Sequence, residues 1–297
     1  KVAPTNSRIM ILGPSGSGKE LVARMIHRKS NRANGPFVAL NAAAITPDRM
    51  EIALFGTEGS AGQPRKTGAL EEAHGGILYL DEIGEMPRET QNKILRVLVE
   101  QQFERVGGNK RVKVDVRIIS STAYDLEKQI GEGKFREDLY HRLAVVPVRV
   151  PALSERREDI PFLVDAFMRQ ICEHAGIRPR KIGDDALAIL QAHDWPGNLR
   201  QLRNNIERLL ILAQSDGPDT PITADMLPAD VLDAMPKVSS TGDQHIMTLP
   251  LREAREMFER DYLIAQINRF GGNISRTAEF VGMERSALHR KLKTLGV

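Results

Sequence analysis

The sequence RIMILGPSGSGK, residues 8–19, decides the fold of this chain. It begins as a short apolar run typical of a buried strand and ends with the spacing G-x-x-x-x-G-K of a phosphate-binding loop. Glycines in such a loop adopt positive φ angles, so backbone N–H groups can converge on phosphate oxygens. The expected nucleotide-binding residues of this loop are Gly13, Pro14, Ser15, Gly16, Ser17, Gly18 and Lys19. A glycine-rich turn beside a chance lysine is the alternative, which the strand and helix around the loop disfavour.

The residues after the loop predict a helix from Lys19 to about Lys29, whose N-terminus would attract anions. Lys19 can reach the β- and γ-phosphates of ATP. Glu20 stands where the general motif has Ser or Thr to ligate Mg²⁺, and we group it with the nucleotide-binding residues.

A second motif, ILYLDE at residues 77–82, has the Walker-B form of four apolar residues followed by two acids. A strand here would bring Asp81 to the carboxyl edge of the sheet, beside the phosphate loop. We expect Asp81 to hold Mg²⁺ and Glu82 to polarise the water that attacks the γ-phosphate. Two acids capping a helix near Pro87 are the alternative. The expected cofactors are therefore ATP and Mg²⁺.

The rest of the chain predicts three structural parts and a linker. Apolar runs at residues 8–12, 36–40, 77–80, 116–120 and 145–150 alternate with helical patterns, which indicates an α/β domain with a parallel sheet covered on both faces, over residues 1–150. From Pro151 the pattern is all helical, giving a smaller domain over residues 151–230. Prolines and the run SSTGD then predict a flexible linker at 231–248, before a helical domain at 249–297.

The last domain has the pattern of a helix-turn-helix. An amphipathic helix ends at Gly271-Gly272, Asn273 can cap a short helix, Gly282 allows a tight turn, and a second helix follows to about Leu295. Residues near the start of that helix are expected to meet base edges, and later cations to meet phosphates. The first group is Arg285, Ser286 and His289, and the second is Arg290, Lys291 and Lys293. A helical hairpin used only for dimerisation is the alternative.

Composition limits the class of protein. The chain of 297 residues has 41% hydrophobic and 27% charged residues, a net charge of +3, and no apolar run long enough to cross a membrane. Its single cysteine, Cys172, indicates a reducing compartment, and no signal segment opens the sequence. We therefore expect a cytoplasmic protein. Because the chain begins at Lys1, we expect it to be a piece of a longer one.

Four longer motifs resemble the AAA+ ATPase domain of bacterial enhancer-binding proteins, the regulators that act on the sigma-54 form of RNA polymerase. They are GSGKE at 16–20, LDEIGEMP at 80–87, FREDLYHRL at 135–143 and WPGNLRQL at 195–202. The C-terminal sequence resembles the Fis-type DNA-binding module of the same family. The resemblance covers nearly the whole chain and implies an AAA+ core, a helical lid and a helix-turn-helix.

The resemblance also implies roles for single residues. Asn41 matches the switch residue that pairs with Glu82, although an asparagine at a strand end can also simply satisfy backbone groups. Arg136 and Arg142 match arginine fingers, which reach the nucleotide of a neighbouring subunit and offset charge on the γ-phosphate. Thr122 matches the sensor-I position, and Arg200 the sensor-II arginine of the lid.

Two departures from the family pattern bear on function. Ala123 follows Thr122 where the family usually has Asn. The loop after FGTE, residues 55–58, has the sequence GSAGQPRKTG and lacks the Phe-Thr pair with which the family touches sigma-54. This shortened loop resembles that of NtrX-type response regulators. The resemblance implies a phosphoacceptor receiver domain upstream of Lys1 and a cognate sensor histidine kinase as a partner.

The function we predict is a DNA-binding transcriptional regulator of a two-component system, with ATP-linked oligomerisation. Its expected partners are double-stranded DNA with a palindromic operator, and further copies of itself as a dimer or higher oligomer. Hydrolysis of ATP would be weak and dependent on the oligomer. One alternative is an ATP-hydrolysing activator that remodels sigma-54 RNA polymerase. The altered loop disfavours the contact with sigma-54 that this activity needs. The other is a replication-type AAA+ ATPase. No membrane partner is expected.

Overall fold

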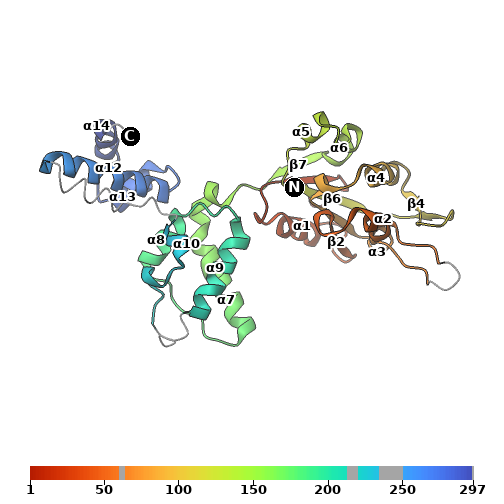
Figure 1. Ribbon diagram of the computed structural model, residues 1–297, viewed down its shortest axis with the longest axis horizontal. Helices are drawn as coiled ribbons and strands as arrows, with labels where there is room; N and C mark the ends of the chain where they lie inside the picture. The colour runs from red at the N-terminus through yellow and green to blue at the C-terminus, as the bar shows by residue number, and fades with distance from the viewer. Residues whose placement is uncertain (60–63, 213–219, 234–249, 296–297) are drawn as a thin grey trace. The chain divides into compact units, whose positions relative to one another are not determined.

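The computed structural model describes residues 1–59, 64–212, 220–233 and 250–295 (Figure 1). The chain divides into two compact units, Lys1–Pro151 and Ala152–Val297. The linker expected at 231–248 lies mostly outside the described residues. None of the helices in the described ranges has the length and apolarity that crossing a membrane demands.

A five-stranded parallel sheet forms the centre of the first unit, in the order β2-β3-β6-β1-β7. The strands are β1 (Ile9–Leu12), β2 (Phe37–Asn41), β3 (Ile77–Asp81), β6 (Arg117–Thr122) and β7 (Val146–Arg149). The sheet confirms the α/β fold predicted from the apolar runs. Its order places the end of β1 beside the ends of β6 and β7, with β3 and β2 next in line, so the loops after these strands meet at one edge.

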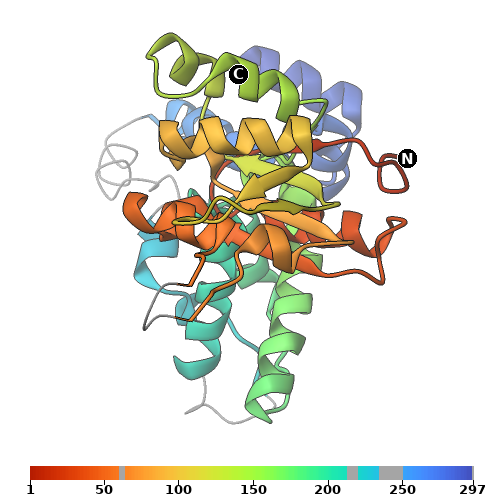
Figure 2. The same ribbon diagram turned by 90° about the vertical axis from the view of Figure 1, so that its right-hand side faces the viewer.

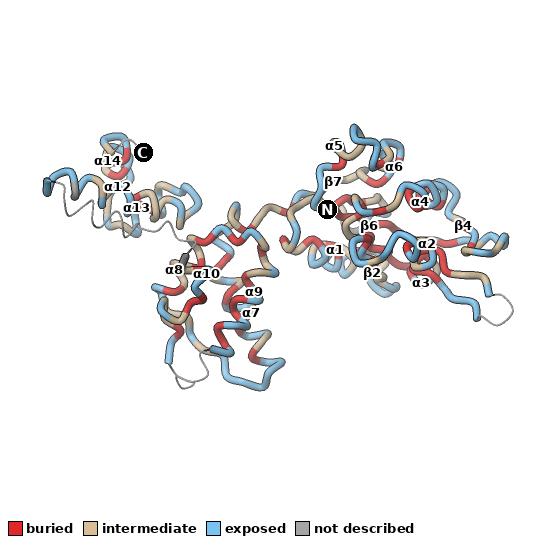
Figure 3. The backbone as a smooth tube through the Cα atoms, viewed as in Figure 1, coloured by how far each residue is buried: buried red, intermediate tan, exposed pale blue. Residues whose placement is uncertain are grey.

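Side chains alternate between two cores on the two faces of the sheet. Ile9, Ile11, Tyr79 and Ile119 face the side where Ala23 of α1 (Lys19–Arg28) packs. Met10, Leu78 and Ile118 belong to the opposite core, which also contains residues of α2 (Pro47–Phe55), α3 (Ala69–Glu72), α4 (Arg88–Glu100), α5 (Leu126–Gly131) and α6 (Glu137–Leu143). Figure 3 shows the resulting buried strands and exposed outer loops. Both faces of the sheet are therefore covered, as predicted.

A hairpin that is not among the predicted strands projects from this unit and faces the viewer in Figure 2. It consists of β4 (Gln102–Glu104) and β5 (Arg111–Lys113), paired antiparallel. Single bridges join Thr57 to Lys66 and to Val106. The loop that follows α2 and the turn of the hairpin therefore lie side by side.

The second unit is helical and has two cores. The first is formed by α7 (Ile160–Ala175), α8 (Asp184–Ala192), α9 (Asn198–Leu212) and α10 (Ala229–Asp233), around buried Trp195 and Cys172. The second is formed by α12 (Leu251–Arg269), α13 (Ile274–Phe280) and α14 (Arg285–Leu295), around Leu263, Ala278, Leu288 and Leu292. These helices confirm the predicted helical lid and the all-α C-terminal part.

Candidate nucleotide-binding site and nucleic-acid interface

The phosphate loop runs from the end of β1 into α1, and its backbone requires glycine. Gly16 and Gly18 have φ angles of 73° and 99°, in the left-handed region that favours glycine. A Cβ atom on Gly13 would lie 2.4 Å from the carbonyl oxygen of Val150. Gly13 also donates its N–H to the carbonyl of Thr122 at 3.3 Å. The loop is thus fixed against β6 and the end of β7.

Lys19 is buried at the first turn of α1, with 6% of its surface exposed. Its Nζ donates to the carbonyl oxygens of Gly13, at 3.0 Å, and Pro14, at 3.4 Å, and forms an ion pair with Glu82 Oε1 at 2.9 Å. The neighbouring Glu20 is exposed and pairs with Arg24 along the helix at 2.7 Å. The ammonium group therefore points into the loop while the Glu20 carboxylate lies on the helix surface.

The carboxylate of Asp81 is held on both oxygens. Oδ1 accepts from the Tyr79 hydroxyl at 2.9 Å and from the Ser121 hydroxyl, and Oδ2 accepts from Asn41 Nδ2 at 3.2 Å. The family resemblance pairs Asn41 with Glu82, whereas here Asn41 pairs with Asp81. Strand register explains the difference, because Asn41 and Asp81 lie directly opposite each other in the β2–β3 ladder.

Glu82 follows β3 with φ 51° and ψ 51°, a left-handed conformation that is uncommon outside glycine. Its Oε2 accepts from the backbone N–H of Ala123 at 2.8 Å, while Oε1 pairs with Lys19. Thr122 is buried before Ala123, and its Oγ1 accepts from the Tyr124 N–H at 3.0 Å. The end of β6 thus fixes Glu82 through a main-chain N–H that any residue except proline can supply at position 123.

The three candidate arginines lie on other elements of the chain. Arg136 caps α6, where its guanidinium pairs with Asp138 at 2.6 Å and donates to Asn92 at 2.5 Å. Arg142 is exposed in the last turn of α6 and forms no ion pair within the described residues. Arg200 is an exposed residue of α9, in the second unit.

We call Lys19, Asn41, Asp81 and Glu82, with the groups that contact them, the cluster. The carboxylates of the cluster fit one Mg²⁺ that is also held by phosphates of a nucleotide. No group of three or more His, Cys, Asp or Glu side chains in the described ranges could bind a metal without such help. Mg²⁺ commonly uses one or two carboxylates plus substrate phosphates and retains several waters. Asp81 beside a phosphate loop matches that pattern.

Tyr79 and Ser121 also contact the Asp81 carboxylate, but the motifs do not identify them as site residues. Both lie in buried strands and their hydroxyls are 2.8 Å apart. Burial is the main cause that raises the pKa of Tyr79, so its phenol is protonated at neutral pH. The hydroxyl of Tyr79 within an otherwise apolar run is the sequence signal of this arrangement on β3, whereas Ser121 is one of several polar residues of β6.

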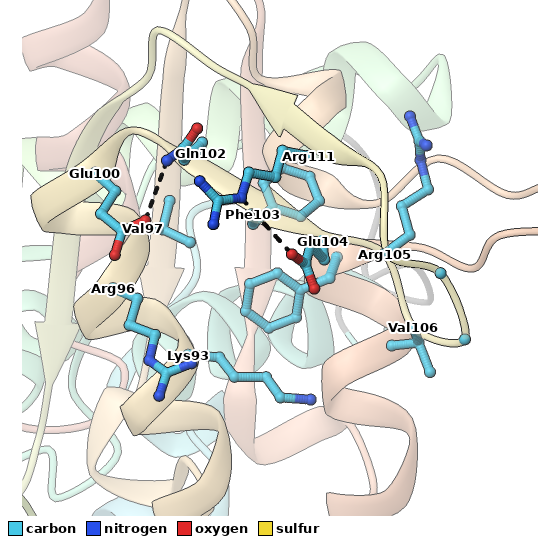
Figure 4. Close-up of a pocket in the computed structure, with 13 residues that line it drawn as sticks. Lys93, Arg96, Val97, Glu100, Gln102, Phe103, Glu104, Arg105, Val106 and Arg111 are labelled. Carbon is cyan, nitrogen blue, oxygen red and sulfur yellow. Dashed lines mark hydrogen bonds and ion pairs between the residues drawn. The ribbon is translucent and has the colours of Figure 1, made fainter.

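A hollow of about 400 Å³ lies apart from the cluster, beside α4 and the β4–β5 hairpin (Figure 4). Phe55, Val97 and Phe103 contribute apolar surface, and Arg96 and Arg111 contribute charge. None of the residues predicted to bind nucleotide lines it.

The base of the loop after α2 is tied to the hairpin by a buried arginine. Arg105 is 5% exposed, and its guanidinium contacts Glu71 at 2.8 Å through two nitrogens and Glu58 at 2.7 Å. These contacts lower the pKa of Glu71, chiefly through the hydrogen bonds from Arg105. Arg65 pairs with Glu71 as well, at 3.0 Å. Residues 60–63 of this loop lie outside the described residues.

The C-terminal helices place the predicted DNA-binding residues on α14. Gly282, with φ 70°, makes the turn between α13 and α14, and Asn273 caps α13 by accepting from the N–H of Arg276 at 3.2 Å. Leu288 and Leu292 hold α14 to the core. The exposed residues of the set are Arg285, Ser286, His289, Arg290 and Lys293. Lys291 is half-buried and pairs with Glu259 of α12 at 2.6 Å, so it differs from the others.

Three family models match consecutive parts of the chain. The sigma-54 interaction domain matches residues 1–149, the AAA+ ATPase lid domain residues 154–244, and the Fis family of bacterial regulatory proteins residues 254–295. The lid and Fis matches agree with the helices of the second unit.

Similar proteins include the nitrogen assimilation regulatory protein NtrX of Azorhizobium caulinodans, 68% identical over the whole chain and 65% of the relative. A putative NtrX-like response regulator of Rickettsia typhi is 44% identical, with 63% of the relative covered. The crystal structure of NtrX from Brucella abortus in complex with ATP is 76% identical, with a TM-score of 0.88 over 100% of this chain and 66% of that one.

The present chain thus spans slightly less than two thirds of the length of these relatives. The agreement of all three matches with the motifs, the sheet and the terminal helices settles its family. The chain belongs to the regulators built on a sigma-54 interaction AAA+ domain, here followed by a lid and a Fis-family helix-turn-helix.

Proposed function

We propose that this chain binds ATP at the phosphate loop and double-stranded DNA through α14, as the effector part of a two-component transcriptional regulator. The convergence of Lys19, Asp81, Glu82 and Asn41 at one edge of the sheet carries the nucleotide half of this proposal. NtrX of Brucella abortus, crystallised with ATP and with ADP, gives it further support.

Each group of the site has a distinct role in this proposal. The N–H groups of the loop, from Gly13 to Lys19, would cradle the phosphates at the positive end of α1, a helix of ten residues. Lys19 would exchange its ion pair with Glu82 for phosphate oxygens. Asp81 would hold Mg²⁺, which supplies charge neutralisation on the phosphates, and Glu82, once released, would orient the attacking water.

Residues outside the cluster would complete the site in an oligomer. Arg136 and Arg142 project from α6 and would serve a neighbouring subunit as arginine fingers, which requires Arg136 to leave Asp138. Thr122, at the end of β6, would sense the nucleotide as the sensor-I residue. Arg200, on α9, would report the nucleotide state to the lid. Weak hydrolysis that depends on the oligomer follows from a site completed in this way.

The DNA-binding half rests on the exposed residues of α14. Arg285, Ser286 and His289 lie in its first turns and would meet base edges in the major groove. Arg290 and Lys293 would meet phosphates, and Lys291 would do so after leaving Glu259. A dimer would read a palindromic operator, and a sensor kinase would act through a receiver domain upstream of this chain.

The match to the sigma-54 interaction domain favours a second candidate, an ATP-hydrolysing activator of sigma-54 RNA polymerase. We propose that this contact does not use the usual loop, because residues 57–67 include Arg65 and Lys66 and no aromatic residue. Small protein contacts gain most of their affinity from buried aromatic and apolar anchors.

In vitro transcription with sigma-54 holoenzyme and ATP separates the two candidates. Our proposal predicts transcriptional control that is lost in Arg285→Ala but is retained in Glu82→Gln. Open-complex formation that requires Glu82 would instead support the activator.

A further inference from the structure

The carboxylate of Asp81 has an unusually full set of hydrogen-bond donors for a metal ligand. Two hydroxyl oxygens lie within hydrogen-bond distance of Oδ1 and an amide nitrogen donates to Oδ2, so two oxygens that together offer about four lone-pair sites meet two or three donated hydrogens. One site on Oδ2 remains for a metal ion or a water bound to it. The orientation of that site is therefore set by the hydroxyls of Tyr79 and Ser121 and the amide of Asn41.

The two hydroxyls form a unit. The oxygens of Tyr79 and Ser121 are 2.8 Å apart, and each oxygen also contacts Asp81 Oδ1. Only two hydroxyl hydrogens are present for these three contacts. In one arrangement the Tyr79 hydroxyl donates to Ser121, and the Ser121 hydroxyl donates to Asp81 Oδ1. In the other, both hydroxyls donate to Asp81 Oδ1.

The scaffold leaves these hydroxyls little freedom to move. Tyr79 is 1% exposed and Ser121 is fully buried, and they belong to the neighbouring central strands β3 and β6. The ring of Phe37 stacks on that of Tyr79 with 6.0 Å between centroids. A donor held in this way orients its acceptor without a further loss of side-chain freedom on binding.

We infer that Tyr79 and Ser121 are positioning residues for Mg²⁺, which fix the Asp81 carboxylate in the orientation that the nucleotide-bound metal requires. This inference rests on the proposed binding of ATP at the same site. Neither hydroxyl touches the nucleotide loop in the contacts described above, so their effect should be confined to the metal.

Calorimetric titration of ATP into the full chain, once with Mg²⁺ and once with EDTA, tests the inference. The wild-type protein should bind ATP more tightly with Mg²⁺. Tyr79→Phe and Ser121→Ala should each reduce this Mg²⁺-dependent gain about tenfold, the scale typical of residues that support a metal ligand. Their affinity for ATP in EDTA should stay at the wild-type value.

Tyr140→Phe is the matched control, because it removes a phenol that contacts a carboxylate, Glu127, elsewhere in the same unit. It should leave the Mg²⁺-dependent gain unchanged. An unchanged gain in both Tyr79→Phe and Ser121→Ala would overturn the inference, and the smaller serine substitution decides the matter if Tyr79→Phe does not fold. Absence of ATP binding in the wild-type protein would instead refute the proposed function.

Discussion

Replacing Glu82 with glutamine should strengthen the binding of ATP. Lys19 Nζ lies 2.9 Å from Glu82 Oε1, and the two side chains are only 5% and 15% exposed. A phosphate can engage Lys19 only as this ion pair opens. Glutamine keeps the shape of the side chain and an oxygen for the Ala123 N–H, but it removes the charge that holds Lys19.

The size of the effect follows from the contacts that remain. A hydrogen bond to a charged group contributes roughly 1.5–3 kcal/mol net. The single amide oxygen of glutamine would serve the Ala123 N–H, so the amide nitrogen that faces Lys19 cannot accept, but the carbonyls of Gly13 and Pro14 stay in place and still hold the ammonium group. We therefore expect the lower end of that range, about 1.5 kcal/mol, which corresponds to roughly a tenfold gain in affinity.

Calorimetric titration with ATP measures this gain, and Glu20→Gln is the matched control. Glu20 is an acid at the start of the same helix, but its partner is Arg24 rather than Lys19. Its substitution changes the local charge by the same amount without touching the ammonium group. If Glu82→Gln binds ATP no better than the wild-type protein, or if Glu20→Gln gains equally, the reasoning about the ion pair fails.

The remaining predictions concern the loop, the hairpin anchor and the DNA-binding helix. Gly13→Ala should destabilise the first unit by about 1–3 kcal/mol, because the added methyl group would overpack against the carbonyl of Val150. Calorimetry should show a lower thermal midpoint, and an unchanged midpoint would contradict the tight fit. Glu71→Gln should lower stability at neutral pH by about 3 kcal/mol, because it leaves buried Arg105 without its full charge partner. Since the pKa of Glu71 is lowered in the fold, its contribution is fully present above the ordinary glutamate pKa and is lost as the pH falls through the lowered value. Chemical denaturation across the acid range should therefore show a steeper loss for wild type than for Glu71→Gln, and parallel curves would count against the anchor. In fluorescence anisotropy, Arg285→Ala should reduce the difference in binding free energy between operator and mutated operator by about 1–3 kcal/mol. Lys293→Ala should weaken the binding of all DNA sequences equally and reduce the slope of log affinity against log salt concentration by about one. The reverse pattern would exchange the roles of the two residues.

The sequence predicts the sheet well because β1 and β3 contain continuous apolar runs, and such runs have few alternatives once a phosphate loop follows the first of them. The hairpin of β4 and β5 is different. Its strands, QFE and RVK, alternate polar-apolar-polar, but at three residues each they are shorter than the run from which a strand is predicted. They are held by their own ladder and by Arg105, whose partners Glu71 and Glu58 lie far away in the sequence, so no local pattern reports these contacts.

The site residues likewise fall into those that the sequence identifies and those that depend on the fold. Motif spacing identifies Lys19, Asp81 and Glu82, because the chemistry of phosphate binding restricts residue types at fixed separations. The contacts of Tyr79 depend on the register between β3 and β6, which sequence periodicity does not give. Strand register likewise decides that Asn41 meets Asp81. The positions of the arginine fingers depend on a second subunit and remain predictions.

ATP binding at the phosphate loop is tested most directly by calorimetric titration of ATP and Mg²⁺ into the full chain and its Lys19→Ala variant. Lys19 is the buried cation of the phosphate loop, and charge-assisted contacts to phosphate are among the stronger hydrogen bonds in proteins. We expect one ATP bound per wild-type chain and an affinity at least roughly tenfold lower in the variant. Equal affinity in the two proteins would contradict it.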